Sequence, residues 1–288
     1  MKKQGRSTRE NKGKKRVPSD LKTKFSETRS KDGKTRQVSF KKKKRVVVSK
    51  HTDGLVRLNK FIANAGVCSR READTLIESG SVKVDGKVVT QLGTRIDPNS
   101  KVTVGDESLR TEKMVYLLLN KPKNYITTSK DPSNRRTVMH LVEGACKERI
   151  YPVGRLDRNT TGLLLFTNDG ELANKLMHPK RGIKKLYHAT LDKNIKQTEL
   201  NKLVEGLKLE DGFASADEVS FVGASKDQVG VVMHMGKNRI VRRMFEHLGF
   251  NVIKLDRVLF AGLNKKDVPR GKHRFLTEKE VNFLKMQV

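Results

Sequence analysis

The chain has 288 residues, of which 62 are Lys or Arg and 32 are Asp or Glu, giving a formal net charge of +30. Such a field attracts polyanions, which makes a nucleic acid the leading partner and an anionic membrane surface the alternative. No apolar run approaches the roughly 20 residues that a membrane-spanning helix needs. Only two cysteines occur, Cys68 and Cys146, which argues against a secreted disulfide framework. With no apolar signal segment after the basic N-terminus, we expect a cytoplasmic protein.

The length predicts one sizeable core and a smaller module, because domains usually hold on the order of 100 to 200 residues. We expect a tail over 1–54, a small domain over 55–113 and a larger domain over 114–288. The first 50 residues contain 20 Lys or Arg and four acidic residues, a net charge of +16. They have no sustained apolar period, so we expect them to be disordered and to attract phosphates non-specifically. A bare solubility extension is the alternative.

Two helices and a hairpin are predicted for the small domain. Apolar residues recur at helical spacing from Leu58 to Ala65 and stop at Gly66, a residue that commonly ends a helix. Ser69 and Glu72 form the S-x-x-E pattern of a capping box, which predicts the start of a second helix. Val82 and Val84 then alternate with polar residues ahead of the tight-turn pair Asp85-Gly86.

This segment, RLNKFIANAGVCSRREADTLIESGSVKVDGKVV, resembles the alpha-L motif, the RNA-binding module of a small-subunit ribosomal protein. The resemblance implies that cationic side chains of the helix pair and hairpin contact phosphates of a structured RNA. An ordinary solvated helix face is the alternative. The cationic residues concerned are Arg57, Lys60, Arg70, Arg71 and Lys83.

The larger domain is predicted to be α+β, with a mixed, mostly antiparallel sheet and flanking helices. Its strands and helices are short and do not alternate steadily, as they would in a doubly wound sheet. The apolar patterns predict strands over 114–119, 150–153, 163–167, 186–191 and 230–234. They predict helices near 171–178, 197–205, 239–248 and 277–286.

The most informative stretch is YPVGRLDRNTTGLLLFTNDG, in which Asp157 lies on a loop between two predicted strands. Loops held by rigid strands commonly carry catalytic groups. A calcium loop is rejected, because Asn168 stands at the twelfth position where a bidentate Glu is required, and Arg158 adds positive charge. Taken alone, Asp157 is more simply explained as a turn or cap residue, and only the complete string favours a catalytic role.

The string G-R-L-D-x-x-T-x-G-L-L-L-x-T-N-D-G resembles the signature motif of the pseudouridine synthases, in the branch that modifies ribosomal RNA one site at a time. The resemblance extends from residue 55 to about 270 and implies an enzyme that isomerises uridine to pseudouridine. KPKNYITTSKDPSNRRTV is closer to the large-subunit members, which favours 23S over 16S rRNA.

The resemblance implies the site residues one by one. The motif's essential aspartate corresponds to Asp157 and its arginine to Arg155, while the family's tyrosine corresponds to Tyr187 in KKLYHATL. The arginine of GKNRIVRRMF corresponds to Arg242, although Arg239-Ile240 stands where relatives often have another polar pair. In KLDRVLF, Leu255 is expected to pack near the uracil, with Arg257 in the same element.

This chemistry requires a base taken out of its stack and no redox or group-transfer cofactor. The carboxylate would begin it by adding covalently to the sugar or the uracil, or by removing the ribose 2′ proton. If Arg242 reaches Asp157, a bidentate contact would favour the ionised carboxylate. Tyr187 would stack on the uracil and assist removal of the C5 proton. Phosphate binding by Arg242 and a core position for Tyr187 are the alternatives.

No cofactor and no metal are expected. The seven histidines and two cysteines show no zinc-ligand spacing, and no phosphate-cradling loop occurs. The expected partner is ribosomal RNA within a large-subunit assembly intermediate, bound by a monomer. The competing functions are a catalytically silent RNA-binding or assembly protein on the same fold, and a ribosomal structural protein.

Overall fold

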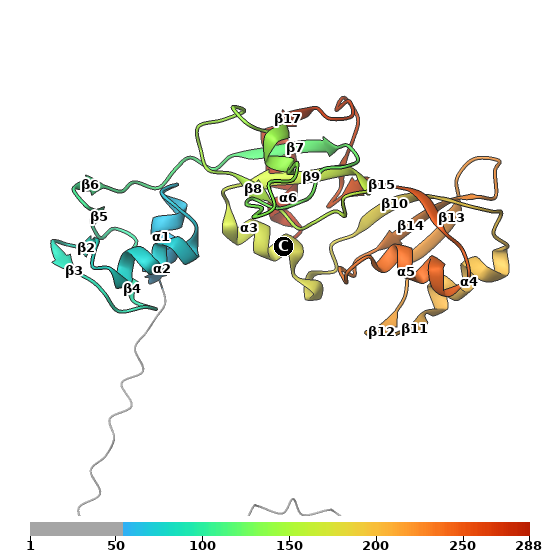
Figure 1. Ribbon diagram of the computed structural model, residues 1–288, viewed down its shortest axis with the longest axis horizontal. Helices are drawn as coiled ribbons and strands as arrows, with labels where there is room; N and C mark the ends of the chain where they lie inside the picture. The colour runs from blue at the N-terminus through green and yellow to red at the C-terminus, as the bar shows by residue number, and fades with distance from the viewer. Residues whose placement is uncertain (1–53) are drawn as a thin grey trace, which may run out of the picture. The chain divides into compact units, whose positions relative to one another are not determined.

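The computed structural model describes residues 54–288. The predicted disordered tail over 1–54 therefore lies outside the described residues, except for its last one. Within the described residues, no helix is long and apolar enough to cross a membrane. Figure 1 shows the described residues from the small N-terminal part, in blue and cyan, to the larger part, in green to red.

The small part contains the predicted helix pair and hairpin. Helix α1 (Leu58–Asn64) is followed by α2 (Arg70–Glu78), which begins at the predicted capping box: Ser69 accepts from the Glu72 amide, and the Glu72 carboxylate accepts from the Ser69 amide. A four-stranded antiparallel sheet has the order β3-β2-β5-β6. The strands are β1 (Val56–Arg57), β2 (Val82–Val84), β3 (Lys87–Val88), β4 (Arg95–Ile96), β5 (Val102–Val104) and β6 (Glu107–Ser108), with β1 paired to β4.

The larger part is built on a nine-stranded sheet with the order β13-β14-β10-β15-β9-β7-β17, in which β16 pairs with β15 and β8 with β9. Among these named strands only β9 and β15 pair in parallel. The strands are β7 (Tyr116–Lys121), β8 (Tyr151–Pro152), β9 (Thr161–Thr167), β10 (Lys185–Leu191), β13 (Glu218–Phe221), β14 (Gln228–Met233), β15 (Val252–Phe260), β16 (Leu263–Asn264) and β17 (His273–Phe275). The prediction of an α+β fold with a mixed, mostly antiparallel sheet is confirmed.

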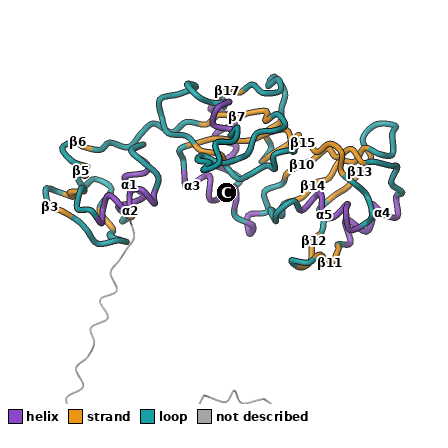
Figure 2. Tube along the Cα trace, viewed as in Figure 1, coloured by secondary structure: helices purple, strands orange, loops and turns teal. Residues whose placement is uncertain are grey.

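Helices flank this sheet, and a separate two-stranded hairpin stands beside it. Helices α4 and α5 lie along the β10-β14-β13 half, whereas α3 and α6 lie along the β7-β9 half (Figure 1). Residues 122–150, between β7 and β8, are mostly irregular (Figure 2). The remaining elements are α3 (Gly170–Met177), α4 (Gln197–Glu205), α5 (Ile240–His247), α6 (Glu278–Met286), η1 (Val138–Leu141), η2 (Pro179–Arg181), β11 (Leu207–Leu209) and β12 (Gly212–Ala214).

The central strands β7 and β9 are buried on both faces. Successive side chains of a strand point to opposite faces, and here both sets are apolar: Leu163 and Leu165 join one core cluster, and Leu164 and Phe166 join another. This explains why their sequences are continuous apolar runs instead of alternating ones. All five predicted strands and all four predicted helices of this part are confirmed, with shifts of a few residues. The strands β11, β12, β13, β15, β16 and β17 were not predicted.

Gly162 allows the parallel pairing of β9 with β15. Its φ is +105°, and a Cβ at this position would lie 2.3 Å from the backbone oxygen of Arg257. Only glycine has both the required backbone freedom and the required absence of a side chain. Since β9 begins directly after the loop that carries Asp157, this close approach sets where that loop leaves the sheet.

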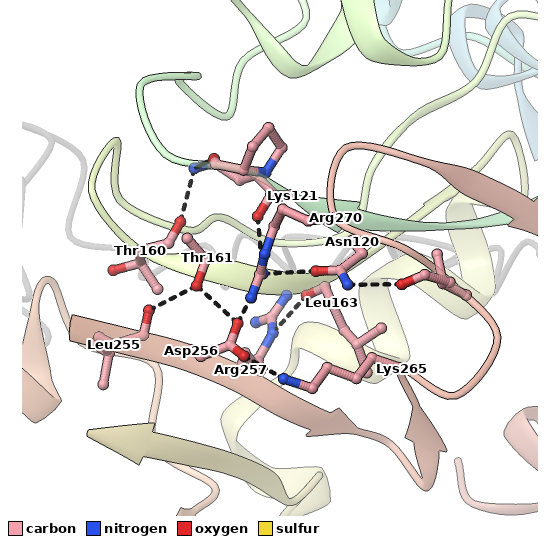
Figure 3. A network of polar contacts seen from close by, with 12 residues as sticks. Asn120, Lys121, Thr160, Thr161, Leu163, Leu255, Asp256, Arg257, Lys265 and Arg270 are labelled. Atoms are coloured by element: carbon pink, nitrogen blue, oxygen red, sulfur yellow. Dashed lines mark hydrogen bonds and ion pairs between the residues drawn. The ribbon is translucent and has the colours of Figure 1, made fainter. Parts of the chain in front are cut away.

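A polar network also ties the strands together around Asp256 of β15 (Figure 3). Its carboxylate accepts from Thr161 Oγ1 at 2.8 Å and from Arg270 Nη1 at 2.9 Å, and it also pairs with Lys265. Arg270 Nη1 lies 2.7 Å from Asn120 Oδ1 on β7. One carboxylate thus joins β15, β9 and β7 through groups up to 150 residues apart in sequence.

Asp256→Asn is expected to destabilise the fold at neutral pH. Burial raises the pKa of Asp256, but hydrogen bonds from Arg270, Lys265 and Thr161 outweigh it and lower that pKa to about 2. Because this is below the unfolded value, the stabilisation is complete above roughly pH 4 and is lost as the pH falls through about 2. We expect a cost on the order of 1 kcal/mol, or about 2–4 °C in Tm.

Thermal unfolding of wild type and variant between pH 7 and pH 3 measures this, and the difference in Tm should shrink at the acidic end. The control is Glu171→Gln, which breaks the exposed i,i+4 pair with Lys175 and should change Tm little, since exposed pairs contribute little. A difference that stays constant over this pH range would contradict the assignment.

Candidate active site

Asp157 lies on the loop between β8 and β9 and lines a cavity of about 590 Å³. This volume is in the range of sites for small ligands. The residues of the loop on either side of it, Arg155, Leu156 and Arg158, line the same cavity. Tyr187 on β10 and Leu255 on β15 also line it. Four of the predicted site residues, Asp157, Arg155, Tyr187 and Leu255, are therefore brought together by the fold.

The ammonium group of Lys121, the last residue of β7, holds the loop that carries Asp157 through hydrogen bonds. Its Nζ donates to the carbonyl oxygens of Thr160 (2.8 Å), Pro122 (3.0 Å), Asp157 (3.1 Å) and Arg158 (3.3 Å). The side chain is fully buried, and burial lowers its pKa to about 8, opposed by the Asp157 carboxylate. A buried cation is thus satisfied by backbone oxygens of the loop that carries Asp157.

Thr127 holds the same loop from the other side. Its Oγ1 donates to the Leu156 carbonyl at 2.8 Å and accepts from the Leu156 amide at 3.2 Å. The Asn124 amide donates to the Arg158 carbonyl at 2.9 Å. The backbone around Asp157 is therefore positioned by the segment that follows β7, while within residues 54–288 no hydrogen bond or ion pair involves the Asp157 carboxylate.

Arg242 of α5 does not form the bidentate contact with Asp157 that was considered from the sequence. Its Nη1 donates instead to the carbonyl of Val252 at 2.7 Å, and its Nε is buried without a partner in the described part of the chain. Burial lowers the pKa of Arg242, the Arg239 charge adds to this, and the Asp157 carboxylate opposes it. Arg242 therefore acts on Asp157 only through its charge here, because its guanidinium is directed to β15.

Several residues of the site were not predicted. Lys185 adds a cationic side chain to the cavity, and Lys237 adds another from the loop before α5. Arg239 and Arg257, which the resemblance had already placed in family elements without a role, also line it. Burial lowers the pKa of Lys185 to about 8, and the nearby Arg257 charge adds to this. The signal for Lys121 was present in the sequence, since a lysine directly after the apolar run of β7 has little access to water.

The five predicted RNA-binding residues of the small part lie elsewhere, on α1, α2, β1 and β2. Arg57, Arg70, Arg71 and Lys83 are exposed and Lys60 is partly exposed. Arg70 Nη2 donates to Asn59 Oδ1 at 3.3 Å. Their side chains are accessible to a ligand. In the described part of the chain no group of three or more His, Cys, Asp or Glu residues could hold a metal ion.

Comparison with known proteins identifies the family of this chain. The profile of the RNA pseudouridylate synthase family matches residues 115–247, and the S4 domain profile matches residues 56–107. The chain is 44% identical over 234 residues to the ribosomal large subunit pseudouridine synthase B of Bacillus subtilis, covering 80% of this chain and 95% of the relative. The chain belongs to the RNA pseudouridylate synthase family. Enzymes of this family isomerise uridine to pseudouridine, so the predicted enzyme class is confirmed.

Other relatives agree. The synthase B of Vibrio cholerae is 40% identical over 239 residues, covering 80% of this chain and 74% of the relative. A solved crystal structure of a pseudouridylate synthase superposes with a TM-score of 0.58 at 27% identity, covering 80% of this chain and 99% of that one. The aspartate-based mechanism is general for the family, and Asp157 occupies the signature motif.

Lys121→Met is expected to lower the saturated rate by about 100-fold, because a small displacement of a catalytic group is enough to cause such a loss. The substitution keeps a long unbranched side chain, shorter by the ammonium nitrogen, but leaves the loop carbonyls without a donor, at a cost of about 1–3 kcal/mol for each unsatisfied group. A single-turnover assay of tritium release from C5-labelled uridine measures the rate. Lys123→Met, two residues away at an exposed position, is the control.

The wild-type rate should also decline as the pH rises past about 8, where Lys121 loses its proton and its charge. RNA affinity of Lys121→Met should stay within a fewfold of wild type. A variant that loses affinity while keeping its rate would show that Lys121 does not act through the Asp157 loop.

Proposed function

We propose that this protein isomerises one uridine of large-subunit ribosomal RNA to pseudouridine, with Asp157 as the catalytic carboxylate. The observation that carries the proposal is the position of Asp157: its loop is held by Lys121 and Thr127, and it lines one cavity together with Tyr187 and Leu255. The choice of 23S over 16S rRNA rests on the names of the relatives from Bacillus, Vibrio and Haemophilus, each a ribosomal large subunit pseudouridine synthase B.

The division of labour follows the proposed domains. Residues 55–113 bind the RNA through the exposed cations Arg57, Lys60, Arg70, Arg71 and Lys83. Residues 114–288 hold the flipped uridine in the cavity and carry out the chemistry. Residues 1–54 add non-specific attraction to phosphates. In this arrangement residues 55–113 provide the RNA affinity and residues 114–288 provide the catalysis.

The reaction moves one bond and one proton. The bond from C1′ to N1 breaks, the uracil rotates while it is held in the cavity, and a bond from C1′ to C5 forms. The C5 proton is then lost and N1 gains a proton, so the product is an isomer of the substrate and no group or electron is transferred to a cofactor. The Asp157 carboxylate begins the reaction either by covalent addition or by removal of the 2′ proton.

The remaining site residues position the base. Tyr187 offers its ring for stacking and its phenol for removal of the C5 proton. Leu255 packs near the uracil, and Arg155, which is exposed at the rim of the cavity, contacts a phosphate. Arg242 contributes positive charge near Asp157 without forming a hydrogen bond to its carboxylate.

The proposed setting is the cytoplasm, where a monomer acts on a large-subunit assembly intermediate. A base buried in the mature ribosome is not free to leave its stack, so an intermediate offers the more accessible substrate. Activity on intermediates, on mature subunits and on naked transcript distinguishes these substrates.

Asp157→Asn should abolish pseudouridine formation while leaving folding and RNA affinity close to wild type. The amide is nearly isosteric with the carboxylate but is neither a base nor a useful nucleophile. Tritium release from C5-labelled large-subunit rRNA measures the chemistry, and thermal unfolding and filter binding check the fold and the affinity. Release at the wild-type rate would leave a silent RNA-binding protein as the function.

Replacing both Arg70 and Arg71 with Ala should raise the RNA concentration needed for half-maximal activity and leave the saturated rate unchanged. Each lost phosphate contact should also lower the slope of log affinity against log salt concentration by about 0.7–0.9. Binding and turnover measured between 50 and 200 mM salt test this. A collapse of the saturated rate at constant affinity would contradict a binding role for this helix.

A further inference from the structure

The hairpin formed by β11 and β12 carries an exposed aromatic ring near the candidate active site. Phe213 on β12 is 59% exposed, the most exposed of the described aromatic residues that contribute large apolar surface. The two three-residue strands are antiparallel: Leu207 pairs with Ala214 at one end of the hairpin, and Leu209 pairs with Gly212 at the other. While Leu207, Leu209 and Ala214 are buried in the core cluster against α4 and α5, Phe213 points away from that core.

The far end of the ring lies against the main chain at Gly206. A Cβ at Gly206 would lie 2.0 Å from Phe213 Cζ, and Gly206 itself has a φ of +101°. The ring therefore rests against a position at which a side chain would collide with it. This backing limits the movement of the ring and leaves its other side in solvent.

The hairpin is tied to the loop that lines the cavity. Lys237 Nζ donates to the carbonyls of Asp211 (2.9 Å) and Phe213 (3.1 Å), and Lys237 is itself a cavity-lining residue. Arg243 of α5 pairs with the Asp211 carboxylate at 2.8 Å and donates through Nε to the carbonyl of Asn238 at 2.9 Å. The hairpin is thus bound to a residue that lines the cavity, and the Asp211 carboxylate is paired with two cations.

We propose that Phe213 is a stacking platform for an unpaired base of the substrate RNA, next to the uridine that enters the cavity. The inference rests on the proposed function. When one nucleotide is flipped out, its neighbours lose a stacking partner. Exposed aromatic rings bind single-stranded bases by stacking, with about 1–3 kcal/mol for each base.

The surroundings of Phe213 favour an RNA base over a protein partner. The ring is a single exposed aromatic residue on a two-stranded hairpin, whereas protein interfaces bury a larger apolar patch. Lys237 and Arg239 line the cavity together with Asp157, where they meet the phosphates on either side of the flipped nucleotide. The flat ring supplies the stacking surface that these cations lack.

The test compares Phe213→Ala, Phe213→Leu and Phe213→Tyr in the full-length protein, with C5-tritiated large-subunit rRNA transcript as the probe. We expect Ala and Leu to raise KM for the transcript about tenfold, which corresponds to about 1.4 kcal/mol, with kcat within about twofold of wild type. Tyr keeps a flat ring and should restore the wild-type KM. The matched control is Phe283→Ala on α6, since Phe283 is 45% exposed, lies against Gly262 in a similar way and does not line the cavity.

Three outcomes would overturn the proposal. The first is a Phe213→Leu variant that behaves like wild type, because a non-planar apolar side chain cannot stack. The second is a loss that Phe283→Ala reproduces. The third is a loss on large-subunit particles that is absent on naked transcript, which would assign the ring to a protein contact. If wild type released no tritium at all, the proposed function would fail, and filter binding of the same transcript would still test Phe213.

Discussion

The active-site loop depends on one buried charge. An ammonium group taken out of water is costly unless hydrogen bonds satisfy it, and Lys121 meets this requirement with four carbonyl oxygens, three of them from the segment Asp157–Thr160. The dependence is mutual, since the loop carbonyls need a donor and Lys121 needs acceptors. Any displacement of the loop would therefore expose an unsatisfied cation inside the fold. This makes the position of Asp157 a property of the core and not of the loop alone.

The arrangement of the core strands in turn fixes the position of Lys121 and of the loop. Lys121 ends β7, the loop returns into β9, and β9 pairs with β7 along its length and with β15 only at Thr161 and Gly162. Arg270 donates to Asn120, to the Lys121 carbonyl and to Asp256. The network that joins the three strands (Figure 3) therefore also positions Lys121, whose ammonium group holds the loop. Leu255, next to Asp256, faces the cavity on the opposite side of the strand.

Features set by residues close together in the sequence were predicted, whereas contacts between residues far apart in the sequence were missed. The capping box at Ser69 and Glu72 lies within four residues, and the apolar runs of β7 and β9 need no partner to be recognised. Strand β15 was missed because its burial does not alternate: bulges opposite β10 place charged Asp256 and Arg257 among apolar residues. The role of Lys121 was missed although its position directly after an apolar run indicates burial, because nothing in the neighbouring sequence shows which groups it binds. Its acceptors lie up to 39 residues away in sequence, and Asn120 and Arg270 are farther apart still.

The charges around Asp157 explain how a site rich in cations keeps its carboxylate free. Lys121 is engaged with backbone oxygens, Arg242 with the Val252 carbonyl, and Arg257 through Nε with the Leu163 carbonyl at 2.8 Å. Each of these cations is thus held by a neutral acceptor, and none forms an ion pair with the Asp157 carboxylate. Within the described residues that carboxylate is therefore left unoccupied, although cationic side chains line the same cavity. A direct ion pair would occupy the carboxylate oxygens that the proposed reaction needs.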